Sequence, residues 1–148
     1  MSSRKRQGSN NILNISGENN ISKNNDIQKI VFKVVEGYIA ALNQRDVSGL
    51  ETYLHFPHTR VMLEGGLMRW NSANEYLESF QTRLKADKWH STKLISVETD
   101  VISLKKCHSL IWFKRLRQNG STINTYQSLY VITQIEENWG ILLGSGTG

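Results

Sequence analysis

Two histidines, His55 and His58, flank the only proline of the chain in the stretch LHFPHTRV. Imidazole titrates near neutral pH, which suits it to proton transfer. A zinc site needs three or four ligands, and H-x-x-H interrupted by proline lacks the i, i+4 helical face of HExxH. No third ligand lies nearby in the sequence, so we predict no metal site. The two histidines are instead candidates for acid–base chemistry or for positions in a turn.

Tyr38 is the third candidate for chemistry. Apolar residues recur from Ile27 to Leu42 with helical spacing, and Tyr38 lies on that apolar face. A phenol there can donate a hydrogen bond to a ligand in a pocket. The alternative is a core tyrosine whose hydroxyl group finds a backbone partner. Gly37, inside the same helix, costs up to roughly 1 kcal/mol relative to alanine and indicates close packing at that point.

Aromatic and polar side chains later in the chain are candidates for lining a pocket. Tyr126, Ser128 and Tyr130 share one face of an expected strand, because side chains alternate with period two. Polar-tipped aromatic residues on one face suit a small-molecule pocket, but they equally suit a core or a dimer interface. The other pocket candidates are Trp70, Phe80, Trp89 and His90. For His90 the alternative is an exposed position at the start of a strand.

The sequence predicts the elements that must position these residues. We expect a helix from Asp26 to about residue 44, capped by Asn25 or Asp26, and a short second helix over 47–54. Pro57 should end that helix, because the residue before a proline avoids the αR region. Two short strands joined at Gly65-Gly66 follow, and Ser72 with Glu75 forms a capping box for a third helix. The remainder, from Trp89, is typical of hairpin-connected strands.

This order of elements indicates the fold class. Helices followed by a run of strands favour an α+β domain, with three N-terminal helices packed on one face of an antiparallel sheet. We expect that domain to span residues 26–148. Residues 1–25 contain seven Asn and five Ser residues and are expected to be a disordered tail.

Composition and charge narrow the function classes. The formal net charge is +5, but residues 1–25 carry +3 of it, so we consider nucleic-acid binding unlikely. The basic run KRLR, 114–117, is interpreted as a solvated strand end beside a turn. A single cysteine, Cys107, excludes an internal disulfide. We find no apolar run long enough for a membrane span and no secretory signal, so we expect a cytoplasmic protein.

The stretch VVEGYIAALNQRDVSGLETYL, residues 34–54, resembles the first two helices of ketosteroid isomerases, in which Y-[VI]-A-A-L-N…D-x-x-G recurs. With the order of elements, it is similar to the nuclear transport factor 2-like superfamily, which includes SnoaL-like cyclases and scytalone dehydratases. The resemblance implies that the sheet is curved and forms a cone with the helices, with an apolar pocket for a small organic molecule at its open end. It also implies a homodimer through the outer sheet face.

The resemblance also implies roles for particular residues. Tyr38 matches the tyrosine that stabilises an oxyanion in the isomerases. Their carboxylate base has only Glu64 as a counterpart, and QSLYVITQI lacks their carboxylic acid. We therefore expect cofactor-independent isomerisation, dehydration or cyclisation, with Tyr38 donating a hydrogen bond and His58 or His55 moving the proton. The alternative is a non-catalytic ligand-binding or dimerisation module.

Overall fold

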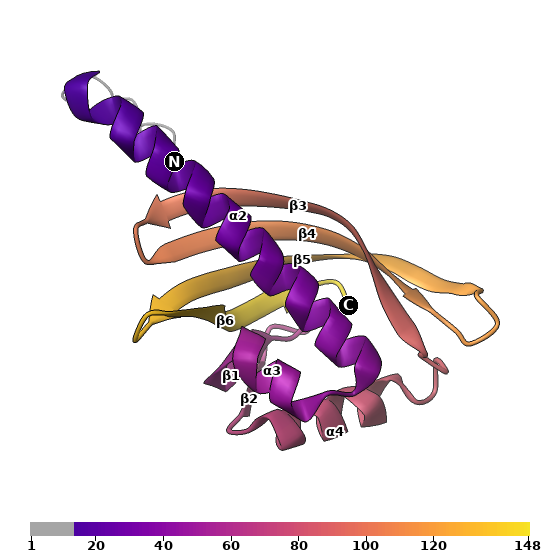
Figure 1. Cartoon of the computed structure of the whole chain (residues 1–148). Coiled ribbons are helices and arrows are strands. Elements are labelled where there is room, and N and C mark those ends of the chain that lie inside the picture. Colours follow the sequence, from indigo (N-terminus) through magenta and orange to yellow (C-terminus); the bar gives the residue numbers. More distant parts are fainter. Residues whose placement is uncertain (1–13) are drawn as a thin grey trace.

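The computed structural model describes the backbone of residues 14–148 and the side chains from residue 20 on. Three helices and six strands follow one another in the described part of the chain (Figure 1). Their bounds are α2 Asn14–Gln44, α3 Val47–Tyr53, β1 Leu54–Val61, β2 Leu67–Trp70, α4 Ala73–Leu84, β3 Ser91–Ser103, β4 Lys106–Leu116, β5 Thr122–Ile135 and β6 Asn138–Gly146. The expected α+β class, with helices first and a curved sheet after them, is confirmed. No helix within the described residues is long and apolar enough to cross a membrane.

The six strands form one sheet in the order β2-β1-β6-β5-β4-β3. The expectation of a purely antiparallel sheet is wrong at one place, because β1 pairs with β6 in parallel, with Arg60 opposite Gly144. Every other neighbouring pair is antiparallel. The strands β3 to β6 are consecutive hairpins, whereas β1 and β6 lie at the two ends of the strand-forming sequence. No local pattern indicates that such distant segments are neighbours.

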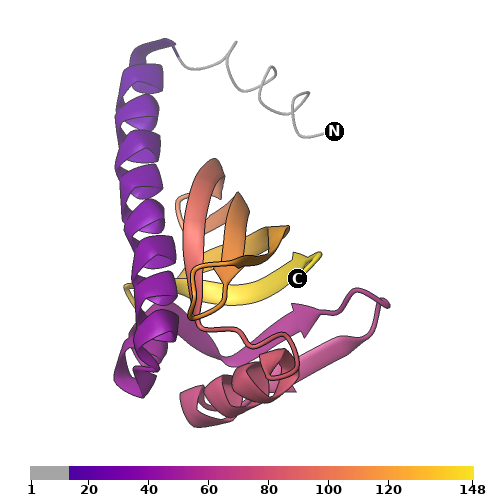
Figure 2. The same cartoon turned by 90° about the vertical axis from the view of Figure 1, so that its right-hand side faces the viewer.

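The helices lie on one side of the sheet and leave its other side uncovered (Figures 1 and 2). Helix α2 runs along the concave face, and α4 lies below it beside the β1–β2 hairpin. Buried apolar residues of α2, α4 and the inner sheet face form one core, which includes Val35, Phe80 and Ile111. This arrangement brings one end of the sheet, the lower half of α2 and α4 around a common interior.

Pro57 was expected to mark the end of the second helix, but it is not the residue that follows this helix. It lies inside β1, which runs unbroken from Leu54 to Val61 and contains the whole stretch LHFPHTRV. The constraint on the residue before proline excludes helix but allows extended backbone, so it suits a strand as well as a loop. The helix does end before this stretch, at Tyr53.

Helix α2 begins at Asn14, well before the expected start at Asp26. Asn25 and Asp26 therefore lie inside the helix and do not cap it. Side chains 20–26 are exposed, and Ile27 is the first buried residue. Because this stretch buries nothing, its helical conformation has no apolar pattern that sequence reasoning could detect. The predicted disorder of residues 1–13 lies outside the described residues.

Several local predictions are confirmed. The hydroxyl group of Ser72 accepts a hydrogen bond from the Glu75 backbone amide at 3.2 Å and so caps α4. Gly37 is a point of close packing, since a Cβ atom there would lie 2.3 Å from the Tyr53 ring. The turn between β4 and β5 uses a positive φ of 86° at Gly120.

Candidate functional site

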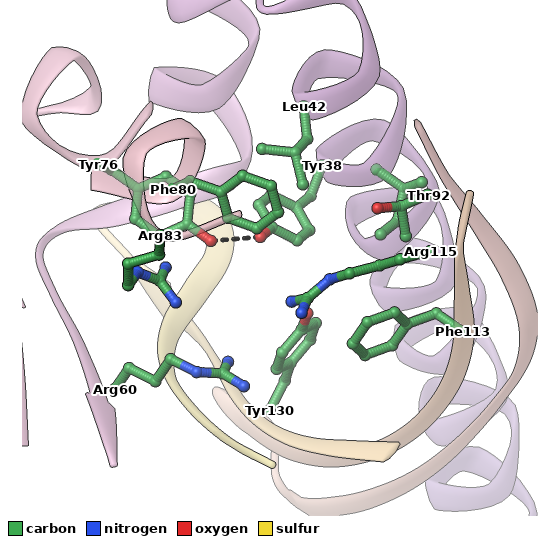
Figure 3. Close-up of a pocket in the computed structure, with 11 residues that line it drawn as sticks. Tyr38, Leu42, Arg60, Tyr76, Phe80, Arg83, Thr92, Phe113, Arg115 and Tyr130 are labelled. Carbon is green, nitrogen blue, oxygen red and sulfur yellow. Dashed lines mark hydrogen bonds between the residues drawn. The ribbon is translucent and has the colours of Figure 1, made fainter. Parts of the chain in front are cut away.

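A cavity lies between α2, α4 and the inner face of the sheet (Figure 3). Its volume, counted for the centre of a water molecule, is about 20 Å³. This is room for about one water molecule. Its walls combine aromatic, aliphatic and cationic side chains: Tyr38, Ile39, Leu42, Arg60, Tyr76, Phe80, Arg83, Thr92, Phe113, Arg115 and Tyr130. The pocket expected to be apolar is therefore strongly polar on one side.

Three arginines from three different elements converge on this cavity (Figure 3). Arg60 comes from β1, Arg83 from α4 and Arg115 from β4. Arg60 and Arg115 are buried, with 9% and 5% of their surface exposed, and Arg83 is half-buried. None of the residues that line the cavity is Asp or Glu. Buried charges in proteins are normally paired, and no carboxylate side chain among the lining residues pairs with these three guanidinium groups.

The arginines are held mostly by aromatic rings. Arg115 lies over the rings of Tyr126 and Phe113, at 4.6 and 5.4 Å from their centroids. Arg83 lies 5.6 Å from the centroid of Phe80. The Nε atoms of Arg83 and Arg115 are buried and have no hydrogen-bond partner among the described residues. Burial lowers the pKa of Arg83 from its ordinary value, which indicates that burying the charged guanidinium group costs free energy.

Arg60 has one backbone partner at the mouth of the cavity. Its Nη2 atom donates a hydrogen bond to the carbonyl oxygen of Gly148 at 2.8 Å. A Cβ atom on Gly148 would lie 3.2 Å from Nη1 of Arg115. The final residues of the chain therefore lie between two of the three arginines.

Three tyrosines face the arginines. The hydroxyl groups of Tyr38 and Tyr76 share a hydrogen bond, and the Tyr130 ring meets Tyr38 edge-on at 6.0 Å between centroids. Burial raises the pKa of Tyr38 well above its ordinary value, and burial raises the pKa of Tyr130 to about 12. Both phenols are protonated at neutral pH. They can donate hydrogen bonds to a ligand but are not bases.

The two histidines of LHFPHTRV do not act together. The ring of His55 lies 3.1 Å from the position that a Cβ atom on Gly140 would take. Gly140 is followed by Ile141, a core residue, and successive side chains of a strand point to opposite faces. His55 therefore lies on the outer face, where its Nε2 bonds the Thr133 carbonyl oxygen at 2.8 Å.

His58 lies inside the domain but behind the cavity wall. It is 4% exposed, its ring packs on Tyr76 at 5.3 Å, and its Nδ1 atom bonds the Ile141 carbonyl oxygen at 3.1 Å. Burial lowers its pKa to about 4, despite an opposing effect of that hydrogen bond. His58 is thus neutral at physiological pH. The cavity residue that its ring contacts is Tyr76.

The other predicted site residues are divided among three places. Phe80 and Tyr130 line the cavity together with Tyr38. Trp70 is a core residue that packs on Tyr76 at 5.1 Å, away from the open space. Around the cavity, Ser128 is buried with no hydrogen-bond partner for its hydroxyl group among the described residues, and Tyr126 supports Arg115.

Trp89 and His90 line a separate groove on the surface. Trp89 still touches the interior, because its ring meets Phe80 at 4.9 Å between centroids. His90 is exposed, as its alternative interpretation proposed.

Sequence reasoning missed the three arginines and Tyr76. The interpretation of KRLR as a solvated run is wrong for Arg115, which points into the core. The alternation of side chains in β4 indicates that Arg115 points inward, because it lies on the same strand face as Ile111 and Phe113, which are both buried. Arg60 likewise lies on the same face of β1 as His58, which is buried. Cationic side chains were assigned to solvent by type, although their strand positions indicated the interior.

The family model described as NTF2-like protein (DUF6841) matches residues 26–145. The chain belongs to this family. The predicted membership of the NTF2-like superfamily is therefore confirmed. No curated protein shows significant similarity to the chain. No group of three or more His, Cys, Asp and Glu side chains capable of holding a metal ion occurs within the described part of this family member.

Solved structures show the same fold at low sequence identity. An NTF2-like protein of unknown function from Shewanella oneidensis MR-1 is 14% identical, with a TM-score of 0.64 over 82% of this chain and 98% of that one. A provisionally assigned ketosteroid isomerase from Shewanella frigidimarina NCIMB 400 is 13% identical, with a TM-score of 0.60 over 79% and 94%. A type 2 hexachlorocyclohexane dehydrochlorinase (LinA) is 8% identical, with a TM-score of 0.63 over 84% and 86%.

Proposed function

We propose that this NTF2-like domain binds a small organic anion, of the carboxylate class, in the interior cavity. The observation that carries the proposal is the convergence of Arg60, Arg83 and Arg115 on one space that no Asp or Glu side chain lines. Guanidinium groups match a carboxylate with two parallel hydrogen bonds, and such bonds are roughly twice as strong as neutral ones. Tyrosine hydroxyl groups add further donors.

The apolar part of the lining defines the rest of the ligand. Ile39, Leu42 and Phe113 present apolar surface to the same space. An anion with a short apolar body would match both the cationic and the apolar lining residues. Because the cavity now holds about one water, such a ligand has to move side chains as it enters. Arg83 is only half-buried and lies on the short helix α4, so it is the side chain best placed to move.

A thermal-unfolding titration of the full chain tests this proposal, with benzoate as the probe and benzamide as its neutral isostere. Benzoate should raise the melting temperature, since a ligand that binds only the folded state stabilises it, and benzamide should not. Arg115→Met should abolish the benzoate effect. The matched control is Arg69→Met, which removes an exposed arginine from β2. Equal responses of the two variants, or equal effects of the two compounds, would contradict the proposal.

A second candidate function is acid–base catalysis of the isomerase, dehydratase or cyclase type. The hydrogen bond between the Tyr38 and Tyr76 hydroxyl groups favours it, because paired phenols can stabilise an oxyanion that develops on a bound substrate. On a substrate found by screening, Tyr38→Phe should lower kcat by about 10²-fold or more, the usual loss for one oxyanion donor. Binding of benzoate by the variant serves as the control for folding. An unchanged kcat would mean that the Tyr38 hydroxyl group does not stabilise the reacting oxygen, and would contradict this role.

We also propose that two copies pair through the outer face of the sheet. Trp112 on β4 and Leu129 on β5 expose 40% and 39% of their surface there, and Leu110 lies directly opposite Leu129. An exposed apolar patch of this kind is typical of an interface. The cytoplasmic location expected from the sequence stays a prediction.

A further inference from the structure

A second hollow lies on the surface, outside the interior cavity. It is formed by the end of α2, the end of α4 with the turn after it, and the hairpin between β4 and β5, and its volume is about 590 Å³. We call it the basic groove; its cationic side chains are Arg45, Lys85, Lys88 and Arg117. We propose that the basic groove binds a phosphorylated small molecule. This site is independent of the anion proposed for the interior.

The charge of the groove favours a multiply charged anion. Four permanent cations line it, and none of its lining residues is Asp or Glu. The C-terminal ends of α2 and α4 also meet there. Each helix end contributes about half a negative charge, so four cations and two helix ends leave about +3. The partial negative charges of the two helix ends therefore neutralise only a minor part of the positive charge of the four cationic side chains.

The backbone of two groove residues adds a separate observation. Arg45 follows α2 with φ of 52°, and Lys88 follows α4 with φ of 59°. Glycine is the usual residue in this left-handed conformation after a helix, because a Cβ atom is disfavoured there. Cationic residues thus occupy both positions in spite of the backbone cost. Such strain is found most often where a ligand site needs a side chain in one place.

Arg45 is already held in position for binding. Its guanidinium lies 4.2 Å from the centroid of the Trp89 ring, and its Nη1 donates to the carbonyl oxygens of Asn43 and His90 at 2.7 and 2.8 Å. A guanidinium has five N–H donors, so those on Nε and Nη2 remain for a ligand. An ordered arginine loses little conformational entropy when an anion binds.

The size and shape of the groove decide between two classes of polyanion. Its volume lies in the range of small-molecule sites, and Gln118 and Asn119 can bind the uncharged part of a ligand. Single-stranded nucleic acid would need an aromatic surface on which bases stack. Trp89 does not offer one, because it is 9% exposed, with Arg45 over its ring and Phe80 against it. The groove therefore fits a phosphorylated small molecule better than RNA.

The experiment is an NMR titration of the full chain with inorganic pyrophosphate at physiological salt. The indole N–H of Trp89 is the reporter, since it is buried beside the groove and donates to the Thr92 hydroxyl group at 3.0 Å. Its signal should shift in a saturable manner, while those of Trp112 and Trp139, which lie outside the groove, stay in place. No shift of the Trp89 signal at millimolar pyrophosphate would overturn the proposal.

Charge-neutral variants make the test specific. Lys85→Gln with Lys88→Gln should weaken pyrophosphate binding about tenfold, as expected for the loss of two exposed charge contacts. The matched control, Lys93→Gln with Lys106→Gln, changes the net charge equally at two exposed lysines elsewhere and should keep the wild-type affinity. Equal weakening by both pairs would mean general attraction to a basic protein and would overturn the proposal.

Two further measurements distinguish the basic groove from the interior cavity and a small phosphorylated ligand from nucleic acid. Arg115→Met should leave the Trp89 response intact, because that arginine lies in the interior cavity; loss of the response would place the probe there and overturn the proposal. A single-stranded oligouridylate should bind more weakly than pyrophosphate. Tighter binding of the RNA, lost in Lys85→Gln with Lys88→Gln, would replace the small phosphorylated ligand with nucleic acid.

Discussion

At the scale of single residues, folding stability and anion binding place opposite demands on Arg115. Its Nε atom is buried without a partner among the described residues, and three aromatic rings surround its guanidinium. Desolvating a charged group costs several kcal/mol. A cation–π contact returns about 0.5–2 kcal/mol. The buried Nε atom has no partner that adds to this return, so we expect Arg115 to lower stability while no anion is bound.

Arg115→Met should raise the free energy of unfolding by about 1–2 kcal/mol in a buffer without organic anions, since methionine fills the same apolar space without a charge. Urea unfolding of both chains measures the difference. The order of stability should shift toward the wild type as benzoate is added, because only the wild type gains from the ligand. A variant that is less stable in both buffers would mean that Arg115 is a structural residue.

His58 gives a prediction for pH. Its pKa is about 4 in the folded chain, because of burial, and about 6.5 in an unfolded one. Between these values the unfolded state binds more protons, so stability is full above pH 6.5 and falls as the pH is lowered toward 4. The loss is on the order of 3 kcal/mol. Unfolding free energies across this pH range should therefore decline more steeply for the wild type than for His58→Phe.

The control for this measurement is His90→Phe, which removes an exposed imidazole. It should keep the steep decline of the wild type. If His58→Phe and the wild type declined in parallel, the neutral buried imidazole would not be the source of the acid sensitivity.

The same residues show what the sequence allows one to predict. The helical period alone places Tyr38 in the interior, because an apolar face identifies every residue on it, whereas the strand period puts Tyr130 on one face with Tyr126 and Ser128 without saying which face is buried. Arg60 and Arg115 obey the same period, but a charged side chain is expected in solvent unless a partner is visible. The observed partner of Arg60, the Gly148 carbonyl oxygen, comes from a distant part of the chain. Such a partner leaves no mark near the arginine in the sequence.

At the scale of elements, the segment after β6, residues 147–148, forms hydrogen bonds with both β5 and Arg60. The Thr147 amide donates to the Gln127 carbonyl oxygen at 2.9 Å, and Gly148 accepts from Arg60. Gly146 makes this path possible, because a Cβ atom there would lie 2.3 Å from the Gln127 carbonyl oxygen. Gly146→Ala should detach the segment and release Arg60.

The released arginine should bind the probe more tightly. One hydrogen bond to a charged group contributes about 1.5–3 kcal/mol at most, so we expect benzoate affinity to rise about three- to tenfold. Thr147→Val is the matched control, since it removes only the hydroxyl contacts to Gln127 and keeps the path of the backbone. An affinity unchanged or lowered in Gly146→Ala would show that the segment helps to form the site.

Element boundaries follow the strength of the local signal. Helix α4 has a cap and an apolar stripe, and was predicted. The run of hairpin-connected strands after Trp89 was also predicted, and its last two turns have backbone with positive φ at Gly120, Glu136 and Glu137. The start of α2 lacks both signals and was missed. The parallel pairing of β1 with β6 follows only from how the whole chain packs.

At the scale of the whole molecule, the uncovered face of the sheet approaches the size of a dimer interface. Strands β3 to β6 have 9 to 14 residues each, which gives a face on the order of 36 Å by 19 Å. A stable interface needs about 800 Å² per partner, and side chains add to the flat area. Trp112 stands near the middle of β4, where a buried aromatic residue would contribute most.

Trp112→Lys should therefore convert a dimer into a monomer, because it places a charge on each side of a two-fold interface. Sedimentation velocity at several concentrations measures the mass. The matched control is Leu63→Lys at the tip of the β1–β2 hairpin, a residue 78% exposed and outside this face, which should remain dimeric. The interior cavity opens on the other side of the sheet, so Trp112→Lys should still respond to benzoate. A wild type that is monomeric at every concentration, or a variant that stays dimeric, would mean that the outer face serves another partner.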